Sequence, residues 1–568
     1  MRDVKPFEEL SLPTPSFGVL KDAYEELITQ MQASKTIAEQ EDIFTRWQQL
    51  DDRLDSWASL TNLRFQQDTT DEVRRQELEF KDEILPKLQD YDVQLKRLML
   101  ESEHRATHEE RYGEHLFNLW EVDIESFRPE IQDDLIALNK LTAEYTELIS
   151  GAEVEFDGEP YNLSQLRKFA SHPERPKREG AERAKWSWVK GAGEEIDRIF
   201  DEMVKLRHQM ATKLGYKDFV ELGYKRMRRT DYTREHVEKF RQEVLRVVVP
   251  LCQELRAYQQ NKLGLESDGL KVWDLLLLDP EGNPEPMGDA EWMIARAREM
   301  FQGLGHGLGE FFEQMADKSY LDLVARKGKA GGGFCTAFPI EKVPFIFANF
   351  NGTEGDVRVF THEMGHAFQF WNSASYPAKD YYWPTYEAAE IHSMSLEFLT
   401  WPHMEKFFGD DAERFRMHHL FEGLIFLPYG VAVDHFQHMV YEQPDATPEE
   451  RRQMWREVEE MYLPWLDWGE IEHGEEGGRW HLQAHIFHVP FYYIDYTLAQ
   501  SCALQLWQRS NEDFDATMKT YKELCEIGGS LPFQEIVQRG ELKSPFESGC
   551  LEDSIAYARQ ILSPMLEP

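Results

Sequence analysis

Apolar residues that recur every three or four positions are the feature that most restricts the fold of this chain. Three such stripes occur within the first hundred residues: Leu20, Tyr24, Leu27, Ile28 and Met31; Ile43, Trp47, Leu50, Leu54 and Trp57; and Ile84, Leu88, Tyr91, Leu95 and Leu98. This spacing places apolar side chains on one face of an α-helix. We therefore expect antiparallel helices packed on one another. A coiled coil is the alternative, although the stripes are short and contain bulky tryptophans.

The rest of the chain also favours helices. β-Alternation is sparse outside residues 343–350 ("VPFIFANF"), and neither an internal repeat nor a low-complexity tract is present. With 568 residues, the chain exceeds the usual size of one domain several-fold, so two or more lobes are expected. Proline, glycine and charged residues crowd at 171–180, 279–286 and 472–478, which are candidate loops or lobe boundaries. The sequence thus predicts a mainly α fold with a small sheet near its middle.

The charge and apolar content exclude some classes of partner. Acidic residues outnumber basic ones by 104 to 63, a formal charge of −41, so nucleic acid is not expected as a partner. The first ten residues have no apolar core of signal-peptide length, and the longest nearly apolar run, 424–433, is too short to span a bilayer. The five scattered cysteines form no C-x-x-C pair. We expect a cytoplasmic globular protein with reduced cysteines and no membrane partner.

The segment "THEMGH", 361–366, carries the pattern of a metal site. On a helix, His362 and His366 lie one above the other and can aim both imidazoles at one Zn²⁺ ion. Glu363 lies about 100° further around the helix, where it can reach a water without binding the metal, and is the candidate general base. Gln369 shares the histidine face, which we expect to look into a cleft. Gly365 is unfavourable in a helix, so its presence predicts a closely packed neighbouring helix.

Two histidines leave a catalytic zinc site one protein ligand short. The segment 387–399, "EAAEIHSMSLEFL", predicts a second helix on which Glu390, Met394 and Glu397 share one face. Glu387 lies one turn before Glu390, and spacing alone leaves both as candidate ligands.

His-Glu-x-Gly-His, followed 24 residues later by E-x-x-S-M-x-x-E, resembles the thimet oligopeptidase family, peptidase family M3. Within that family the chain is most similar to the branch of oligoendopeptidase F and Pz-peptidase. The resemblance implies that one Zn²⁺ is bound by His362, His366 and Glu390. It also implies that Glu397 is the second acidic residue of the family, either beside the metal or as a solvated, helix-pairing carboxylate.

The segment 481–496, "HLQAHIFHVPFYYIDY", concentrates histidine and tyrosine. Composition alone favours an aromatic core helix with satisfied polar tips. The resemblance instead implies that His485, Tyr493 and Tyr496 line the cleft opposite the zinc and donate hydrogen bonds to the substrate carbonyl, with Tyr492 or His488 as substitutes. Three histidines without such context are interpreted as ordinary surface or core residues: His418, His419 and His481.

Upstream, "GKAGGGFCTAF" (328–338) and the apolar strand 343–350 also resemble the family, in which a strand at the cleft edge pairs with an extended peptide. Consecutive glycines allow a close backbone approach, and no G-K-[ST] follows to suggest a phosphate loop. The residues implied to bind substrate are Gly332, Gly333, Phe347, Ala348, Asn349 and Tyr492.

The resemblance implies a two-lobed, zincin-type helical body with a deep central channel. Residues 1–195 would form part of the channel wall and residues 196–568 the catalytic region. The implied activity is zinc-dependent hydrolysis of internal bonds in short, unstructured peptides by a Glu363-activated water. A zinc carboxypeptidase or aminopeptidase with the same site remains an alternative, as does a catalytically dead peptide-binding protein. The oligomeric state is not predicted.

Overall fold

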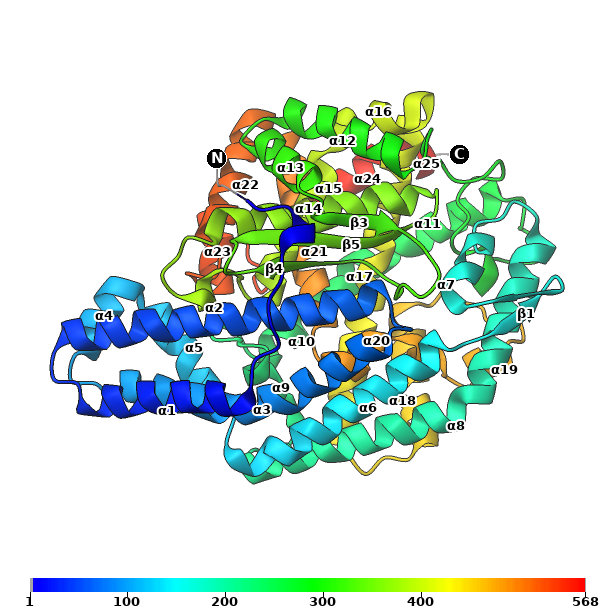
Figure 1. The fold of residues 1–568 in the computed structure, drawn as a ribbon. Coiled ribbons are helices and arrows are strands. Elements are labelled where there is room, and N and C mark those ends of the chain that lie inside the picture. The colour runs from blue at the N-terminus through cyan, green and yellow to red at the C-terminus, as the bar shows by residue number, and fades with distance from the viewer. Residues whose placement is uncertain (1–3, 567–568) are drawn as a thin grey trace.

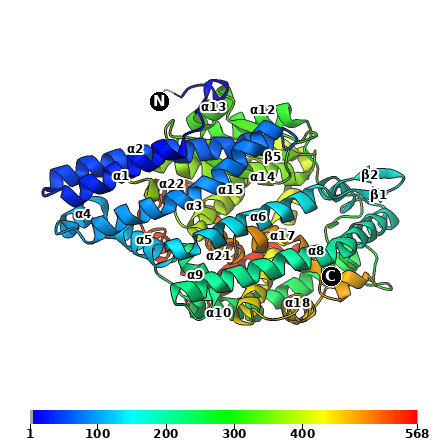
Figure 2. The same cartoon turned by 60° about the horizontal axis from the view of Figure 1, so that its bottom comes forward.

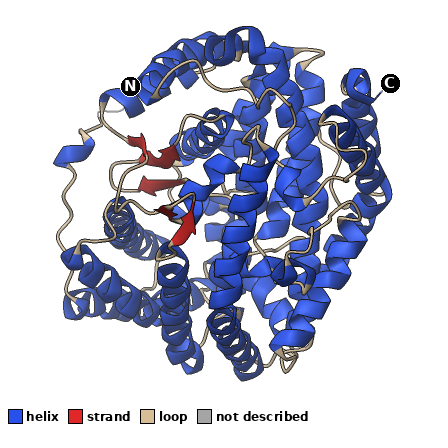
Figure 3. Cartoon of the chain, turned by 90° about the vertical axis from the view of Figure 1, so that its right-hand side faces the viewer, coloured by secondary structure: helices blue, strands red, loops and turns tan. Residues whose placement is uncertain are grey.

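The computed structural model describes residues 4–566, and the predicted mainly α fold is confirmed. Strands occur in these residues only as two small sheets within a body of helices (Figure 3). None of the described helices combines the length and apolarity needed to span a bilayer. The apolar run 424–433 lies instead in a largely buried helix, α17 (Ala412–Glu442). All five cysteines are free, as expected.

The three apolar stripes form the first three helices, as predicted: α1 (Phe17–Ala33), α2 (Ile37–Gln67) and α3 (Glu72–Leu100). Thr36 and Glu39 start α2 with a reciprocal capping box. After α4 (Arg105–Tyr112), α5 (Glu114–Glu125) closes a core with these helices in which Trp47, Trp57 and Trp120 are buried. The bulky side chains fill a shared core, so the arrangement is a helix packing and not a regular coiled-coil seam.

Two long helices follow, α6 (Gln132–Ser150) and α8 (Arg175–Leu214), and lie side by side (Figures 1 and 2). Between them come the hairpin of β1 (Val154–Phe156) and β2 (Glu159–Tyr161), and the short α7 (Leu163–Leu166). Pro176 lies in the first turn of α8, where a missing N–H costs nothing. The predicted division at residues 195 and 196 is not a structural boundary, because it falls inside α8, and Ile196 and Phe200 are buried in the main core.

The main core is formed mostly by residues from the second half of the chain. Its central helices are α14 (Glu354–Ser373), α15 (Tyr386–Leu399), α17 and α21 (Tyr493–Ser510). The other helices are α9 (Phe219–Arg226), α10 (Arg234–Glu243), α11 (Val249–Lys262), α12 (Ala290–Leu304), α13 (Leu308–Asp317), α16 (Glu405–Phe408), α18 (Pro448–Tyr462), α19 (Glu472–Glu475), α20 (Ala484–His488), α22 (Phe514–Ile527), α23 (Phe533–Arg539), α24 (Glu552–Ile561) and α25 (Ser563–Leu566). Four helices thus converge where the sequence places the metal site.

The predicted strand 343–350 is β5 (Val343–Phe350), with the same bounds. It lies between β3 (Leu321–Val324), to which it is parallel, and β4 (Phe334–Phe338), to which it is antiparallel. The expectation that this strand forms the cleft edge is wrong, because both of its edges are paired and Phe347 and Ala348 are fully buried. A continuous apolar run is typical of a strand covered on both faces. The edge strand beside the site is β4.

Candidate metal centre and active site

Helix α14 carries the two histidines and buries the opposite face in the core. Val357, Phe360 and Met364 are almost fully buried, as the apolar stripe predicts. The expectation that Gln369 looks into the cleft is wrong. Its side chain is fully buried, and its Nε2 donates to Ser373 Oγ at 2.8 Å and to the Tyr382 carbonyl at 3.1 Å.

Gly365 lies at the closest approach of α14 and α15. A Cβ atom at this position would lie 2.5 Å from the carbonyl oxygen of His392 and 2.5 Å from the Cα of Ser393. The predicted close neighbouring helix is therefore α15, whose backbone rests on the glycine. This contact determines how near the carboxylates of α15 come to the histidines of α14.

The structure brings His362, His366 and Glu390 together, with one ligand atom of each within 4.8 Å of the others. Glu390 Oε2 lies 3.2 Å from His362 Nε2 and 3.4 Å from His366 Nε2. Ser393 Oγ donates to the same oxygen at 2.7 Å, and the Tyr492 hydroxyl donates to Oε1 at 2.5 Å. Two imidazole nitrogens and one carboxylate oxygen are the donor set of a catalytic zinc site, so these residues fit Zn²⁺.

Glu387, the other candidate ligand, lies outside this group. Its carboxylate is buried without a hydrogen-bond partner among the described residues, and burial raises its pKa to about 7. The charge that most opposes this shift is Arg229, not a histidine of α14.

Glu397 contacts the ring nitrogen of His362 that faces away from the candidate metal position. His362 Nδ1 lies 2.7 Å from Glu397 Oε1, and His419 Nε2 lies 2.8 Å from Oε2. Trp401 Nε1 donates to His419 Nδ1 at 2.9 Å. Because an indole N–H can only donate, His419 Nδ1 accepts from Trp401, and His419 Nε2 carries the proton that is donated to Glu397. Because a carboxylate can only accept, His362 donates to Glu397 from Nδ1, which keeps its Nε2 free for a metal.

This chain of contacts makes Glu397 strongly anionic. Burial alone would raise its pKa, but the hydrogen bonds from His362 and His419 lower it to about 2. Sequence reasoning missed His419, which lies on α17, 22 positions beyond Glu397. No local motif links the two residues, so only the packing of α17 on α15 shows the contact.

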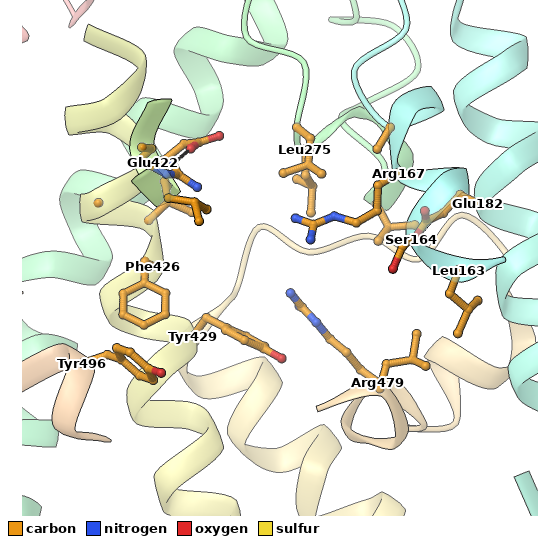
Figure 4. A pocket seen from close by; sticks show the side chains of 18 of the residues that line it. Leu163, Ser164, Arg167, Glu182, Leu275, Glu422, Phe426, Tyr429, Arg479 and Tyr496 are labelled. Atoms are coloured by element: carbon orange, nitrogen blue, oxygen red, sulfur yellow. Dashed lines mark hydrogen bonds and ion pairs between the residues drawn. The ribbon is translucent and has the colours of Figure 1, made fainter. Parts of the chain in front are cut away.

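Glu363 and His362 line a cavity of about 840 Å³. Its lining includes Gly333, Glu363 and His485, and Figure 4 shows Tyr496 and Phe426 on one of its walls. Glu363 is only 6 % exposed, and burial raises its pKa while His362 and His366 oppose the shift. A carboxylate with a raised pKa beside a metal site is suited to accept a proton.

His485, Tyr493 and Tyr496 all line the cavity. Gln483 Nε2 lies 2.8 Å from His485 Nδ1, and the Tyr496 hydroxyl lies 3.4 Å from His485 Nε2. Burial lowers the pKa of His485 to about 4, so its imidazole is neutral near pH 7 and donates from a single nitrogen.

The remaining histidines lie elsewhere. His488 faces Thr146 of α6, with Nε2 at 3.1 Å from the hydroxyl, and does not line the cavity. His481 is buried against Asp197, with 3.0 Å between Nε2 and Oδ1. His418 Nδ1 lies 3.6 Å from Glu354 Oε2. His481 and His418 thus have the ordinary roles expected for them, whereas His488, predicted as a possible substitute in the cleft, does not take that place.

The six implied substrate-binding residues separate in the structure. Among the described residues that line the cavity, only Gly333 belongs to this set. Asn349 Nδ2 donates to the carbonyls of Ala330 and Gly332, both at 2.8 Å, and so stabilises the conformation of the glycine loop. Tyr492 reaches Glu390, a candidate ligand, and not the cavity. Phe347 and Ala348 lie inside the sheet.

This site has the features of a metallopeptidase. They are the HExxH motif on α14, the third candidate ligand on the crossing helix α15, and the cavity beside them. The comparison with family models agrees. A model of the peptidase M3 N-terminal domain matches residues 7–127, and the model of peptidase family M3 matches residues 168–281 and 308–554. The chain belongs to peptidase family M3.

Solved structures place it in one branch of this family. Pz peptidase A with an inhibitor is 43 % identical, with a TM-score of 0.96 over 98 % of this chain and 99 % of that one. A protein from Bacillus anthracis str. Ames assigned as oligoendopeptidase F is 42 % identical, with a TM-score of 0.92 over 99 % of both chains. A comparison with curated proteins gives no match. The likeness reaches the N-terminal helices, further than the motifs alone indicate.

Proposed function

We propose that the protein is a zinc-dependent endopeptidase that hydrolyses internal bonds of short, unstructured peptides. The observation that carries this proposal is the arrangement of His362, His366 and Glu390 around one point, with Glu363 facing the same cavity. The five free cysteines fit the reducing cytoplasm, where we place the reaction.

Each polar group at the site has a distinct task in this reaction. When bound, Zn²⁺ would polarise the scissile carbonyl and lower the pKa of a water. Glu363 takes a proton from the attacking water at its carboxylate and passes it to the leaving nitrogen. His485, Tyr493 and Tyr496 donate hydrogen bonds to the oxygen on which negative charge develops, where one donor is worth on the order of 10²–10³ in rate. Glu397 keeps the proton of His362 on Nδ1.

The outer edge of β4, which pairs with no further strand among the described residues, would bind the substrate backbone. A Cβ atom at Gly333, next to this strand, would lie 3.8 Å from Glu363 Oε1, so the strand begins beside the proposed base. An extended peptide that pairs with a strand edge is held by main-chain hydrogen bonds, whatever its side chains. The cavity also reaches Trp186 and Trp273, which leaves room for peptide beyond the cleaved bond. These features favour internal cleavage of an unfolded segment.

An internally quenched peptide blocked at both ends tests the proposal. We expect cleavage at an internal bond, loss of activity on chelation and recovery with Zn²⁺. Glu363→Gln should retain zinc and lose about 10²–10⁴-fold in kcat. If only peptides with a free end were cleaved, the protein would instead be an exopeptidase. If the purified protein bound no metal and cleaved no peptide, it would be a catalytically dead binding protein. Normal turnover by zinc-loaded Glu363→Gln would refute the assigned base.

A further inference from the structure

The cavity carries an excess of positive charge, although the chain as a whole is strongly acidic. Six basic side chains line it: Arg167, Arg178, Lys185, Arg256, Arg358 and Arg479. Three of them are paired with carboxylates. Arg178 binds Asp274 at 2.7 Å, Lys185 binds Glu182 at 2.6 Å, and Arg358 binds Glu422. Within residues 4–566, the other three have no comparable carboxylate partner.

Arg256 is a buried cation that forms no ion pair with a carboxylate in the part of the chain that the structure describes. It is 7 % exposed, lies over the ring of Phe421, and donates from Nη1 to Gln259 Oε1 at 2.6 Å and to the Leu275 carbonyl at 2.9 Å. Both acceptors are neutral, and its Nε has no partner among the described residues. Burial, together with a smaller contribution from the charge of Arg479, lowers the pKa of Arg256 to about 9. A buried charge of this kind is costly unless an anion compensates it.

Arg479 is only weakly compensated. Its Nη1 lies 3.6 Å from Glu459 Oε1, but Glu459 already accepts hydrogen bonds from Trp455, Arg456 and Trp468. The Arg479 guanidinium stacks over the ring of Tyr429, 4.4 Å from its centre. One carboxylate is therefore shared between two arginines, which leaves a net positive charge at this wall.

Arg167 completes the group from the opposite wall. It lies in the short 3₁₀ turn Arg167–Phe169 and is exposed to the open cavity. Partial loss of solvent around the guanidinium lowers its pKa, and the nearby cation Arg358 lowers it as well. In Figure 4 the guanidinium groups of Arg167 and Arg479 point toward one another across the open cavity. Two uncompensated guanidiniums that face each other repel unless an anion lies between them.

We propose that Arg167, Arg256 and Arg479 form a subsite that binds a carboxylate of the peptide substrate. The inference rests on the proposed endopeptidase function, since it assigns part of the substrate to the same cavity. A guanidinium presents paired N–H donors that match the two oxygens of a carboxylate. Either the C-terminal carboxylate or an acidic side chain supplies that chemistry. In both cases the subsite fixes the direction of the peptide and its distance from the scissile bond.

Matched peptides test the subsite. Three N-acetylated, internally quenched peptides share one sequence: one ends in a free carboxylate, one in an amide, and one in an amide with a glutamate replacing a glutamine beyond the scissile bond. We expect wild type to prefer a carboxylate form over the neutral amide by roughly 10–100-fold in kcat/KM. Preference for the free terminus identifies a terminal anchor, and preference for the glutamate identifies a side-chain pocket. Equal kcat/KM for all three peptides would overturn the proposal.

The variants locate the effect. Arg167→Gln and, separately, Arg479→Gln should bring the ratio between the carboxylate and amide peptides close to one. Lys168→Gln is the matched control, because it removes the same charge from the same turn and its side chain lies over Tyr161 and Phe169, outside the cavity. An unchanged ratio in both arginine variants would refute the assignment.

The amide peptide separates this test from that of the proposed function, because its zinc-dependent cleavage does not require the subsite. If wild type cleaves none of the peptides, the endopeptidase proposal fails. Fluorescence anisotropy of the same peptides then still measures binding, and equal affinity for the acid and amide forms would refute the subsite as well.

Discussion

Replacing Gly365 by alanine tests whether the contact of α14 with α15 sets the metal geometry. The new Cβ would lie 2.5 Å from the His392 carbonyl oxygen and the Ser393 Cα, about 0.9 Å closer than the 3.4 Å at which ordinary contacts begin. Both atoms belong to the backbone, so α15 must move as a unit and carry Glu390 with it. Overpacking of this size typically costs about 1–3 kcal/mol, against which alanine regains about 1 kcal/mol of helix propensity.

Global stability should therefore fall by no more than about 2 kcal/mol, while the metal site loses its geometry. A ligand displaced by about 1 Å costs on the order of 10²-fold in activity. We expect a loss of this order in kcat/KM and weaker zinc binding in competition with a chelator. Gly191→Ala in α8 is the matched control, because a Cβ there meets nothing within 4 Å. Gly365→Ala with unchanged zinc affinity and turnover would refute the reasoning.

Two further predictions concern buried charges. Glu397→Ala and His419→Ala should each weaken zinc binding about 10–100-fold, as measured by competition with a chelator. The control His418→Ala should leave zinc binding unchanged. Equal zinc affinities in all three variants would show that the contact to His362 has no effect on the metal. Burial alone would raise the pKa of Asp380, but Arg228 and other cations lower it below its ordinary 3.8, so its stabilisation is complete above about pH 4 and is lost as the pH falls. Thermal melts of Asp380→Asn should therefore lose part of the acid-side decline in Tm that wild type shows, and an identical pH profile would contradict this.

The elements that local sequence patterns specify were predictable. The stripe of Leu20, Tyr24 and Leu27 became a helix because a period of three to four residues has only one regular backbone that buries it. The bounds of β5 were correct for a similar reason, since an eight-residue apolar run between polar turns suits a strand. His362 and His366 meet one another because their spacing on one helix requires it.

The predictions that failed and the contacts that were missed all depend on how distant segments of the chain pack together. An apolar strand does not show which neighbours pair with it, so the central place of β5 could not be distinguished from an edge. Gln369 shares the histidine face by angle, but one further turn along α14 takes it beneath Tyr382. His419 meets Glu397 only because α17 packs beside α15, and neither sequence contains a sign of the other.

The loop between α14 and α15 explains why α2 and α5 matter to the cavity, although neither helix contributes to its described lining. This loop joins the two helices that carry all three candidate zinc ligands. Asp380 in it accepts from Trp120 Nε1 at 3.2 Å, the Tyr381 hydroxyl accepts from the Leu116 N–H at 2.9 Å, and the Lys379 N–H donates to Gln48 Oε1 at 2.7 Å.

These contacts tie the loop to α2 and α5 through three separate hydrogen bonds, all in a buried or partly buried setting where losing a partner is costly. The N-terminal region therefore restrains the angle at which α15 leaves the loop and crosses α14 at Gly365. Since that crossing sets the distance from Glu390 to the histidines, α2 and α5 act as part of the scaffold of the metal site.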